Sequence, residues 1–227
     1  MFFSLRYVWL AAGLLLTIVQ ITLAQSRPPV GGVYLATRFN GSYLEMQVLY
    51  FAPDGVLYYN PQGADAASLA RYRGTKHRYA VSGKTLNIRR ADGSSTRTEF
   101  NPADPGSFNL DGMILTRRKP FTRWQEVVGT YEGGAAISGA STSRSLKLNP
   151  NGTYSGYTVA SVSTQTDASR VDMGAQGGTE GTWRWSGWTL QFRDRAGNVS
   201  NQIVFPYEMG GSDKDKMFIG GVMYKRY

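Results

Sequence analysis

The sequence has no cysteine and only one histidine, and each shortage excludes a class of chemistry. Without cysteine the chain can form no disulfide, no thiolate metal site and no cysteine nucleophile. The histidine, His77, lies between Lys76 and Arg78, which indicates a residue on a basic surface rather than a catalytic base. The chain also lacks the Gly-x-Ser-x-Gly, His-x-x-x-His and phosphate-loop motifs. We therefore expect a protein that is not an enzyme and that holds no metal and no cofactor.

Long apolar runs are lacking beyond the N-terminus. There, Arg6 precedes an apolar run over residues 7–19, and Thr22-Leu23-Ala24 leads into a polar stretch. This pattern predicts a secretory signal peptide over residues 1–24, cleaved after Ala24, and hence an exported protein that is periplasmic or secreted. The alternative is an uncleaved membrane anchor, but the run is short for a membrane span and Gln20 interrupts its end.

Acidic residues are also scarce, with 16 Asp and Glu against 25 Lys and Arg, for a formal net charge of +9. A basic exported protein is attracted to anionic partners such as lipid head groups, acidic polysaccharide or nucleic acid. The alternative is a solvated surface that keeps the protein soluble. Four cations from two neighbouring clusters are the candidate anion-binding residues: Arg71, Arg73, Lys76 and Arg78.

What the sequence does contain is one hairpin pattern that it uses twice. Pro53-Asp54-Gly55 and Pro150-Asn151-Gly152 each stand between apolar or aromatic stretches. Asp-Gly and Asn-Gly accept the positive φ angles that a tight hairpin requires, so each stretch predicts a strand, a turn and a strand. The spacing between the two turns also separates Gly32-Val33-Tyr34 from Gly129-Thr130-Tyr131, which indicates a repeat.

Further landmarks follow in the same order in both halves. Thr85-Leu86-Asn87-Ile88 matches Thr189-Leu190-Gln191-Phe192, and the last apolar segment of each half aligns Arg118 with Arg226. An ordered set of matches is the signature of an internal duplication. We expect two repeat domains, over residues 28–120 and 121–227.

Each repeat contains short alternating segments joined by tight turns, which favours an all-β fold. Closing such a meander removes its exposed edges. We therefore predict two tandem antiparallel up-and-down β-barrels, each of about seven to eight short strands. The alternative is one larger barrel or a sandwich built from both halves.

Some segments are predicted individually. Residues 62–71 have helical composition and predict a short helix or a lid, whereas the equivalent region at about 160–180 predicts a mobile loop. In the last part of each half we expect strands around residues 96–100, 113–118, 202–205 and 217–225.

The opening Gly32-Val33-Tyr34 and Gly129-Thr130-Tyr131, the central hairpins and the late arginines resemble the lipocalin-like (calycin) family of small barrels. In lipocalins, a Gly-x-Trp near the start packs against an arginine near the end, at the closed end of the barrel. Here tyrosine replaces the tryptophan, and the resemblance implies cation–π contacts of Tyr34 with Arg118 and of Tyr131 with Arg226. It also implies a barrel fold and ligand binding, without naming the ligand.

Aromatic residues are candidates for ligand contact because their flat faces bind sugars, lipids and planar molecules. Trp183 and Trp185 repeat the core phase of Tyr79 and Val81, so core packing is the alternative for these two. Trp188 lies in a turn, where an exposed contact is expected. The candidate ligand-binding residues are Trp183, Trp185, Trp188, Tyr154 and Tyr157.

The segment that precedes the first hairpin is apolar on both faces, whereas its counterpart in the second half is apolar on one face only. Met46, Val48 and Tyr50 make up the additional apolar face. Such a face is expected to be covered by the other domain, by a partner protein or by a ligand, and these three residues are the candidate partner-binding set.

Together these features predict an exported, non-enzymatic binding or accessory protein that carries a small apolar ligand or contacts an envelope component or complex. The alternative is a basic module that binds an anionic polymer, namely acidic polysaccharide, lipid head groups or nucleic acid. Binding of that second kind would be strongly salt-dependent, because each neutralised anion releases counterions.

Overall fold

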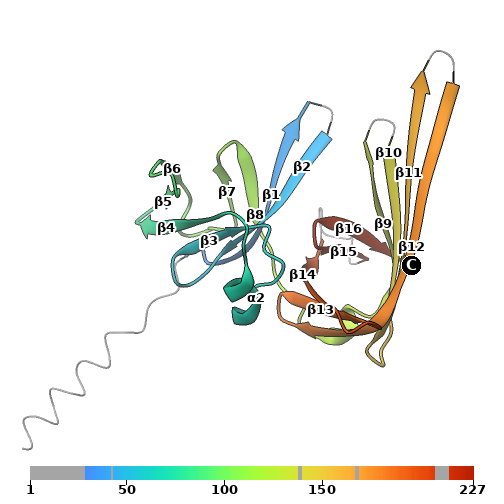
Figure 1. Ribbon diagram of the computed structural model, residues 1–227. Coiled ribbons are helices and arrows are strands. Elements are labelled where there is room, and N and C mark those ends of the chain that lie inside the picture. The colour runs from blue at the N-terminus through green and yellow to red at the C-terminus, as the bar shows by residue number, and fades with distance from the viewer. Residues whose placement is uncertain (1–28, 42, 138–139, 167–168, 208–214) are drawn as a thin grey trace, which may run out of the picture.

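The computed structural model describes residues 29–227 except residues 42, 138–139, 167–168 and 208–214 (Figure 1). The predicted signal peptide therefore lies outside the described residues. The described chain forms two successive eight-stranded antiparallel sheets, which confirms the all-β prediction of two tandem barrels. Within this part of the chain, no helix has the length and apolar character needed to cross a membrane.

The first sheet is an up-and-down meander in the order β6-β5-β4-β3-β2-β1-β8-β7. A helix, α2 (Ala66–Arg71), lies between β3 and β4, where a short helix was predicted. The strands are β1 (Gly32–Asn40), β2 (Tyr43–Phe51), β3 (Val56–Tyr59), β4 (Lys76–Ser82), β5 (Thr85–Arg89), β6 (Ser95–Glu99), β7 (Ser107–Leu110) and β8 (Met113–Arg117).

The second sheet repeats this meander and closes into a barrel, with β9 paired to both β10 and β16. A short 3-10 helix, η2 (Trp124–Glu126), precedes it. The strands are β9 (Gly129–Ile137), β10 (Ala140–Leu148), β11 (Thr153–Thr166), β12 (Ser169–Ser186), β13 (Thr189–Asp194), β14 (Val199–Pro206), β15 (Lys216–Ile219) and β16 (Val222–Arg226).

The two sheets differ at one seam. In the first, β6 and β7 are the ends of the sheet, and side chains rather than a backbone ladder bridge them. Thr98 Oγ1 donates to the backbone oxygen of Asn109 at 2.7 Å, and Thr96 Oγ1 donates to the Asp111 carboxylate at 3.1 Å. In the first barrel, threonine hydroxyl groups therefore link β6 to β7 and the turn that follows it. The second barrel closes through backbone pairing of β9 with β16.

The duplicated hairpins have the same hydrogen bonds in both halves. Gly55 and Gly152 adopt positive φ angles of 77° and 79° in their turns. The carbonyl of Gly55 accepts from the backbone of Tyr79 at 2.8 Å, and that of Gly152 accepts from Trp183 at the same distance. The Tyr79 hydroxyl and the Trp183 indole each donate to the backbone oxygen three residues before these glycines. The two core aromatic residues thus occupy equivalent positions.

The expected pairing of Tyr34 with Arg118 is wrong by one residue. Arg117 lies over the Tyr34 ring at 5.8 Å, and Arg226 lies over Tyr131 at the same distance, whereas Arg118 lies over Tyr207 of the second barrel at 5.3 Å. Side chains alternate between the two faces of a strand, so a slip of one residue moves a side chain to the opposite face. The equivalent of Arg226 is therefore Arg117.

Two segment predictions differ from the structure. Residues predicted as a mobile loop at about 160–180 form most of the β11–β12 ribbon, which is paired from Thr153↔Thr182 to Thr166↔Ser169 and extends beyond the other strands (Figure 1). A paired two-stranded ribbon satisfies its backbone without an apolar face, and its Thr and Val residues favour extended backbone. The single strand predicted over residues 217–225 is two strands, β15 and β16, joined at Gly220-Gly221.

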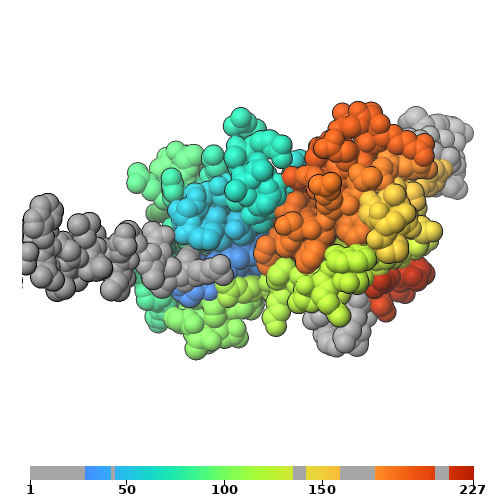
Figure 2. All heavy atoms as spheres, turned by 90° about the horizontal axis from the view of Figure 1, so that it is seen from below, coloured from blue at the N-terminus to red at the C-terminus, as the bar shows by residue number. Residues whose placement is uncertain are grey.

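The two sheets pack against each other through their outer faces, as Figure 2 shows for the blue and cyan first half and the orange strands of the second. The contact is formed by β1 and β2 on one side and by β14 and β15 on the other. Its central rings, Phe205 and Phe218, stack at 4.9 Å. The interdomain cluster consists of Val33, Leu35, Val48, Ile203, Phe205, Tyr207 and Phe218.

Candidate ligand-binding site

The five aromatic residues proposed for ligand binding lie in three different places. Trp183 is 6% exposed and belongs to the core of the second barrel, with Trp185 packed against the same core. Trp188 lies against Phe205 at the interdomain cluster, with ring centres 6.5 Å apart. Only Tyr154 and Tyr157 line a common hollow.

This hollow is the mouth of the second barrel, with a volume of about 370 Å³. Its apolar wall is formed by inward-facing residues that continue the barrel core: Leu146, Tyr154, Phe192, Ile219 and Tyr224. Below them the barrel is filled by side chains that include Leu148, Trp183 and Leu190. The mouth is therefore a pocket with an apolar wall and a polar rim above a packed core, sized for a small ligand.

A cation, Arg144, faces into this mouth. Leu146 and Leu148 of β10 are buried in the core, and Arg144 has the same strand phase as these two leucines. It lines the hollow and forms a side-chain hydrogen bond with the hydroxyl of Tyr224 on β16. Burial raises the pKa of Tyr224, while the neighbouring guanidinium acts in the opposite direction. The net effect is upward, so at neutral pH the hydroxyl stays protonated.

A glycine allows Arg144 and Tyr224 to meet. Gly133 on β9 lies between them, because it pairs with Arg144 on one side and with Tyr224 on the other. A Cβ atom at Gly133 would stand 2.9 Å from the Tyr224 ring and 2.7 Å from the backbone oxygen of Met223. Because Gly133 has no side chain, the Tyr224 ring can lie over β9 at this position.

The acid beside the mouth, Asp194, is already engaged in a turn. Its carboxylate accepts from the side-chain amide and the backbone N–H of Asn198, both at 2.8 Å. These bonds hold the pKa of Asp194 below its ordinary value and outweigh the opposing effect of desolvation. Both carboxylate oxygens of Asp194 therefore accept hydrogen bonds within the turn at the rim, which is a structural role.

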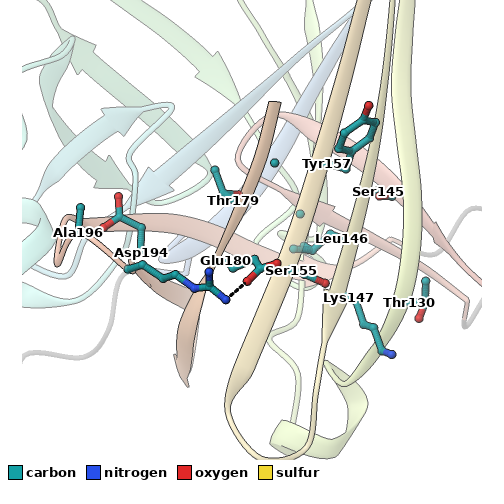
Figure 3. Close-up of a pocket in the computed structure, with 13 residues that line it drawn as sticks. Thr130, Ser145, Leu146, Lys147, Ser155, Tyr157, Thr179, Glu180, Asp194 and Ala196 are labelled. Carbon is teal, nitrogen blue, oxygen red and sulfur yellow. Dashed lines mark ion pairs between the residues drawn. The ribbon is translucent and has the colours of Figure 1, made fainter. Parts of the chain in front are cut away.

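A second hollow, of about 780 Å³, adjoins the mouth and shares part of its lining, including Leu146, Tyr157 and Thr179 (Figure 3). It is lined by outward-facing residues of β10 and β11, among them Ser145, Lys147 and Tyr157. Glu180 at its edge forms an ion pair with Arg195, drawn as a dashed line in Figure 3. This hollow is larger and slightly more open than the mouth, so it encloses a small ligand less completely and is a weaker candidate.

The four candidate anion-binding residues divide between two hollows of the first half. Lys76 and Arg78 line one of about 420 Å³ on the outer face of β4, with Arg89 and Arg90. Arg71 and Arg73 line a cleft of about 820 Å³ that also includes Asn201 of the second barrel. The structure thus separates the four into two pairs.

The apolar face predicted for a partner lies against the second barrel. Val48 is 4% exposed within the interdomain cluster, and Met46 and Tyr50 pack against that cluster. This face was expected to be covered by the other domain, by a partner protein or by a ligand. In the structure, the other domain covers it. A partner that contacts these residues would first have to displace the second barrel.

Candidate catalytic groups do not gather in the described part of the chain. His77 is half-buried, with its ring edge-on to Tyr59 at 5.2 Å, so it is less exposed than its neighbours suggested. Within the described residues, no group of three or more His, Asp or Glu side chains lies close enough to hold a metal ion.

Comparisons with known proteins add no family to this geometry. No family model matches the chain, and no curated protein and no solved structure matches it significantly. The fold therefore defines the class of protein, a tandem of two eight-stranded β-barrel domains.

Sequence reasoning missed Arg144, the central residue of the mouth. A signal was available in the sequence, because Leu146 and Leu148 form the apolar face of this segment and Arg144 continues their alternation. A cation in phase with core residues is unusual, since a buried charge is costly unless it is paired. The position equivalent to it in the first repeat holds the uncharged Gln47.

Proposed function

We propose that the protein is a non-enzymatic binding protein whose second barrel holds one small ligand in its mouth. The ligand has an apolar body and an anionic end group such as a carboxylate. The observation that carries this proposal is Arg144, which stands on the core face of β10, bonded to Tyr224 above an apolar wall.

The chemistry of the two polar groups favours an anion. A guanidinium donates two parallel hydrogen bonds to a carboxylate and binds it more strongly than it binds a neutral group. The protonated Tyr224 hydroxyl can donate a further hydrogen bond to the same anion. Leu146, Phe192 and Ile219 then remove the apolar body from water, which stabilises the complex by about 25 cal/mol for each Å² buried.

The proposal includes kinship with lipocalin-like barrels and export from the cell. The kinship is supported by the up-and-down closed barrel and by the contact of Gly129, Tyr131 and Arg226. Export is supported by the signal-peptide pattern over residues 1–24. This contact lies where β9 begins, whereas Gly133 and Arg144 lie farther along the barrel toward the mouth. We compare these two positions with the closed end and the open end of a lipocalin barrel. The second barrel covers the face that motivated an accessory role, so ligand binding by the chain itself is favoured.

The test is binding of octanoate, a small apolar carboxylate, measured by calorimetry. We expect Arg144→Gln to weaken octanoate binding by about tenfold or more, because the anion loses its charge-assisted hydrogen bonds. Octanol, which has the same body without the charge, should bind equally to both proteins.

The matched control is Arg184→Gln, which removes an exposed arginine from β12 of the same barrel. It should leave octanoate affinity unchanged. Equal octanoate affinity in the Arg144 and Arg184 variants, or no octanoate binding to the unmodified protein, would contradict the proposal.

A further inference from the structure

The outer face of the first barrel carries three cations side by side at one place. Arg78 on β4 is paired directly with Arg89 on β5, and Lys76 lies two residues before Arg78 on the same face. All three are exposed and line one hollow of about 420 Å³, with Val56 and Tyr58 beside them. We call this the cation site.

Among the described residues, the cations of the cation site are not matched by ion-pair partners. In the described part of the chain, no ion pair includes Lys76, Arg78 or Arg89. By contrast the next residue, Arg90, forms an ion pair with Asp111 at 2.7 Å. Like charges placed directly opposite on a sheet are destabilising, so the Arg78–Arg89 pair costs stability unless an anion lies between the two.

The hydrogen bond that the structure shows for the Arg78 side chain goes to the backbone of the hairpin turn and not to a carboxylate. Among the described residues, Arg78 Nη1 donates to the backbone oxygen of Asp54 at 3.4 Å, a long and weak bond. The Asp54 carboxylate accepts from the backbone of Val56 at 3.3 Å instead. Arg78 is therefore positioned by the turn, but its charge is not neutralised by an ion pair.

The second repeat shows that the fold itself does not require this arrangement. The positions equivalent to Lys76, Arg78 and Arg89 hold Glu180, Thr182 and Arg193. There, Arg193 is paired with the neutral Thr182, and Glu180 forms an ion pair with Arg195. The same backbone positions thus carry mixed charges in one copy and only positive charges in the other.

One wall of the cation site is formed by packed, largely buried side chains. Tyr58 is 8% exposed, and its ring packs against Tyr50 at 6.3 Å and against Tyr72 at 5.4 Å. Strand pairing places Tyr58 opposite Lys76 and Val56 opposite Arg78. A small anion that enters this hollow therefore meets packed side chains on one side and guanidinium groups on the other.

We infer that the cation site binds a phosphate group, with Arg78 and Arg89 as its two main donors and Lys76 as a third. Guanidinium groups match the oxygens of a phosphate with parallel hydrogen bonds, and two of them side by side can share one dianion. The phosphate can be free or can belong to a lipid headgroup. The site is in the first barrel and is independent of the mouth of the second.

The experiment uses the full chain and the variant Arg78→Thr, which installs the residue that the second repeat carries at this place. Two probes are used: inorganic pyrophosphate by calorimetry, and phosphatidylglycerol vesicles by co-sedimentation. At least one of the two probes should bind the unmodified protein. For that probe, we expect Arg78→Thr to weaken the binding by about tenfold or more. Pyrophosphate binding assigns a free phosphate, and binding of vesicles alone assigns a lipid headgroup.

A stability measurement distinguishes a binding role of Arg78 from a purely structural role. In phosphate-free buffer of low salt, Arg78→Thr should melt at a higher temperature than the unmodified protein, because the repulsion with Arg89 is relieved. Pyrophosphate should raise the melting temperature of the unmodified protein more than that of the variant.

The matched control is Arg193→Thr, the equivalent of Arg89 in the second barrel, which should change neither probe binding nor its salt dependence. Octanoate binding should be unaffected by Arg78→Thr. The inference is overturned if neither probe binds, or if Arg78→Thr binds the probe as tightly as the unmodified protein and Arg193→Thr do.

Discussion

At the scale of the residue, one arginine in each barrel contacts the beginning of the first strand and the tyrosine that follows it. The Arg226 guanidinium lies over the Tyr131 ring and donates to the backbone oxygen of Val128. Arg117 makes the same two contacts with Tyr34 and Gly31 in the first barrel. Burial raises the pKa of Tyr131 to about 12, so its hydroxyl stays protonated and donates to the backbone oxygen of Val127 at 2.8 Å.

The glycine beside this contact is predicted to be essential for stability. A Cβ atom at Gly129 would stand 2.6 Å from Nε of Arg226, which would displace the guanidinium from Tyr131. We expect Gly129→Ala to lower the free energy of unfolding by about 1–3 kcal/mol, measured by urea unfolding.

The control for that substitution is Gly177→Ala, because a Cβ atom at Gly177 would have no neighbour within 4 Å. It should change stability by no more than about 0.5 kcal/mol. Equal stability of the two variants would show that the contact of Arg226 with Tyr131 contributes little.

At the scale of the element, the sequence predicted what depends on local chemistry. The Asp-Gly and Asn-Gly hairpins, the helix at 66–71 and the alternation around Leu86 and Leu190 are all present. These features follow from turn conformation and from burial on one face of a strand, which the residues themselves determine.

Barrel closure was predicted correctly, but three finer features that depend on strand pairing were not predicted. The sequence alignment shifted the last strand by one residue, because Arg117 and Arg118 are adjacent cations and only the pairing of Tyr34 with Arg117 distinguishes them. The long β11–β12 ribbon was predicted as a loop because it lacks the apolar face that marks a barrel strand. Arg144 could have been predicted from its phase, but its contact with Tyr224 depends on closure of the barrel through Gly133.

At the scale of the whole molecule, a polar network joins the two barrels beside the interdomain cluster. Asp65 caps α2 of the first half, accepting from the backbone of Ser68 at 2.9 Å, and also accepts from the Thr189 hydroxyl of the second barrel at 3.0 Å. The side chain of Asn201, also in the second barrel, donates to the Ser68 hydroxyl at 2.7 Å. Thr189 and Asn201 are both buried, so the network is largely shielded from water.

This network predicts energetic coupling between the halves. Burial alone would raise the pKa of Asp65, but hydrogen bonds from Ser68 and Thr189 outweigh it and hold the pKa below its ordinary value. In a double-mutant cycle of Asp65→Ala with Thr189→Val, we expect a coupling of about 0.5–1.5 kcal/mol in the free energy of unfolding near pH 7.

The pH dependence of this coupling follows from the sign of the shift. The folded pKa of Asp65 is lowered, so its stabilisation is present above the unfolded value of about 4 and is lost as the pH falls through the folded value. The coupling should therefore shrink in acid. Additive effects of the two substitutions at neutral pH would contradict contact between the barrels at this place.

The central claim is that the mouth of the second barrel holds a small anionic ligand at Arg144. Its most direct test is native mass spectrometry of the protein purified gently from its own host, compared with the denatured mass and with Arg144→Gln prepared in the same way. The account predicts an adduct of roughly a few hundred daltons on the unmodified protein, released on denaturation and lost in the variant. A bare chain in both, or the same adduct in both, would contradict it.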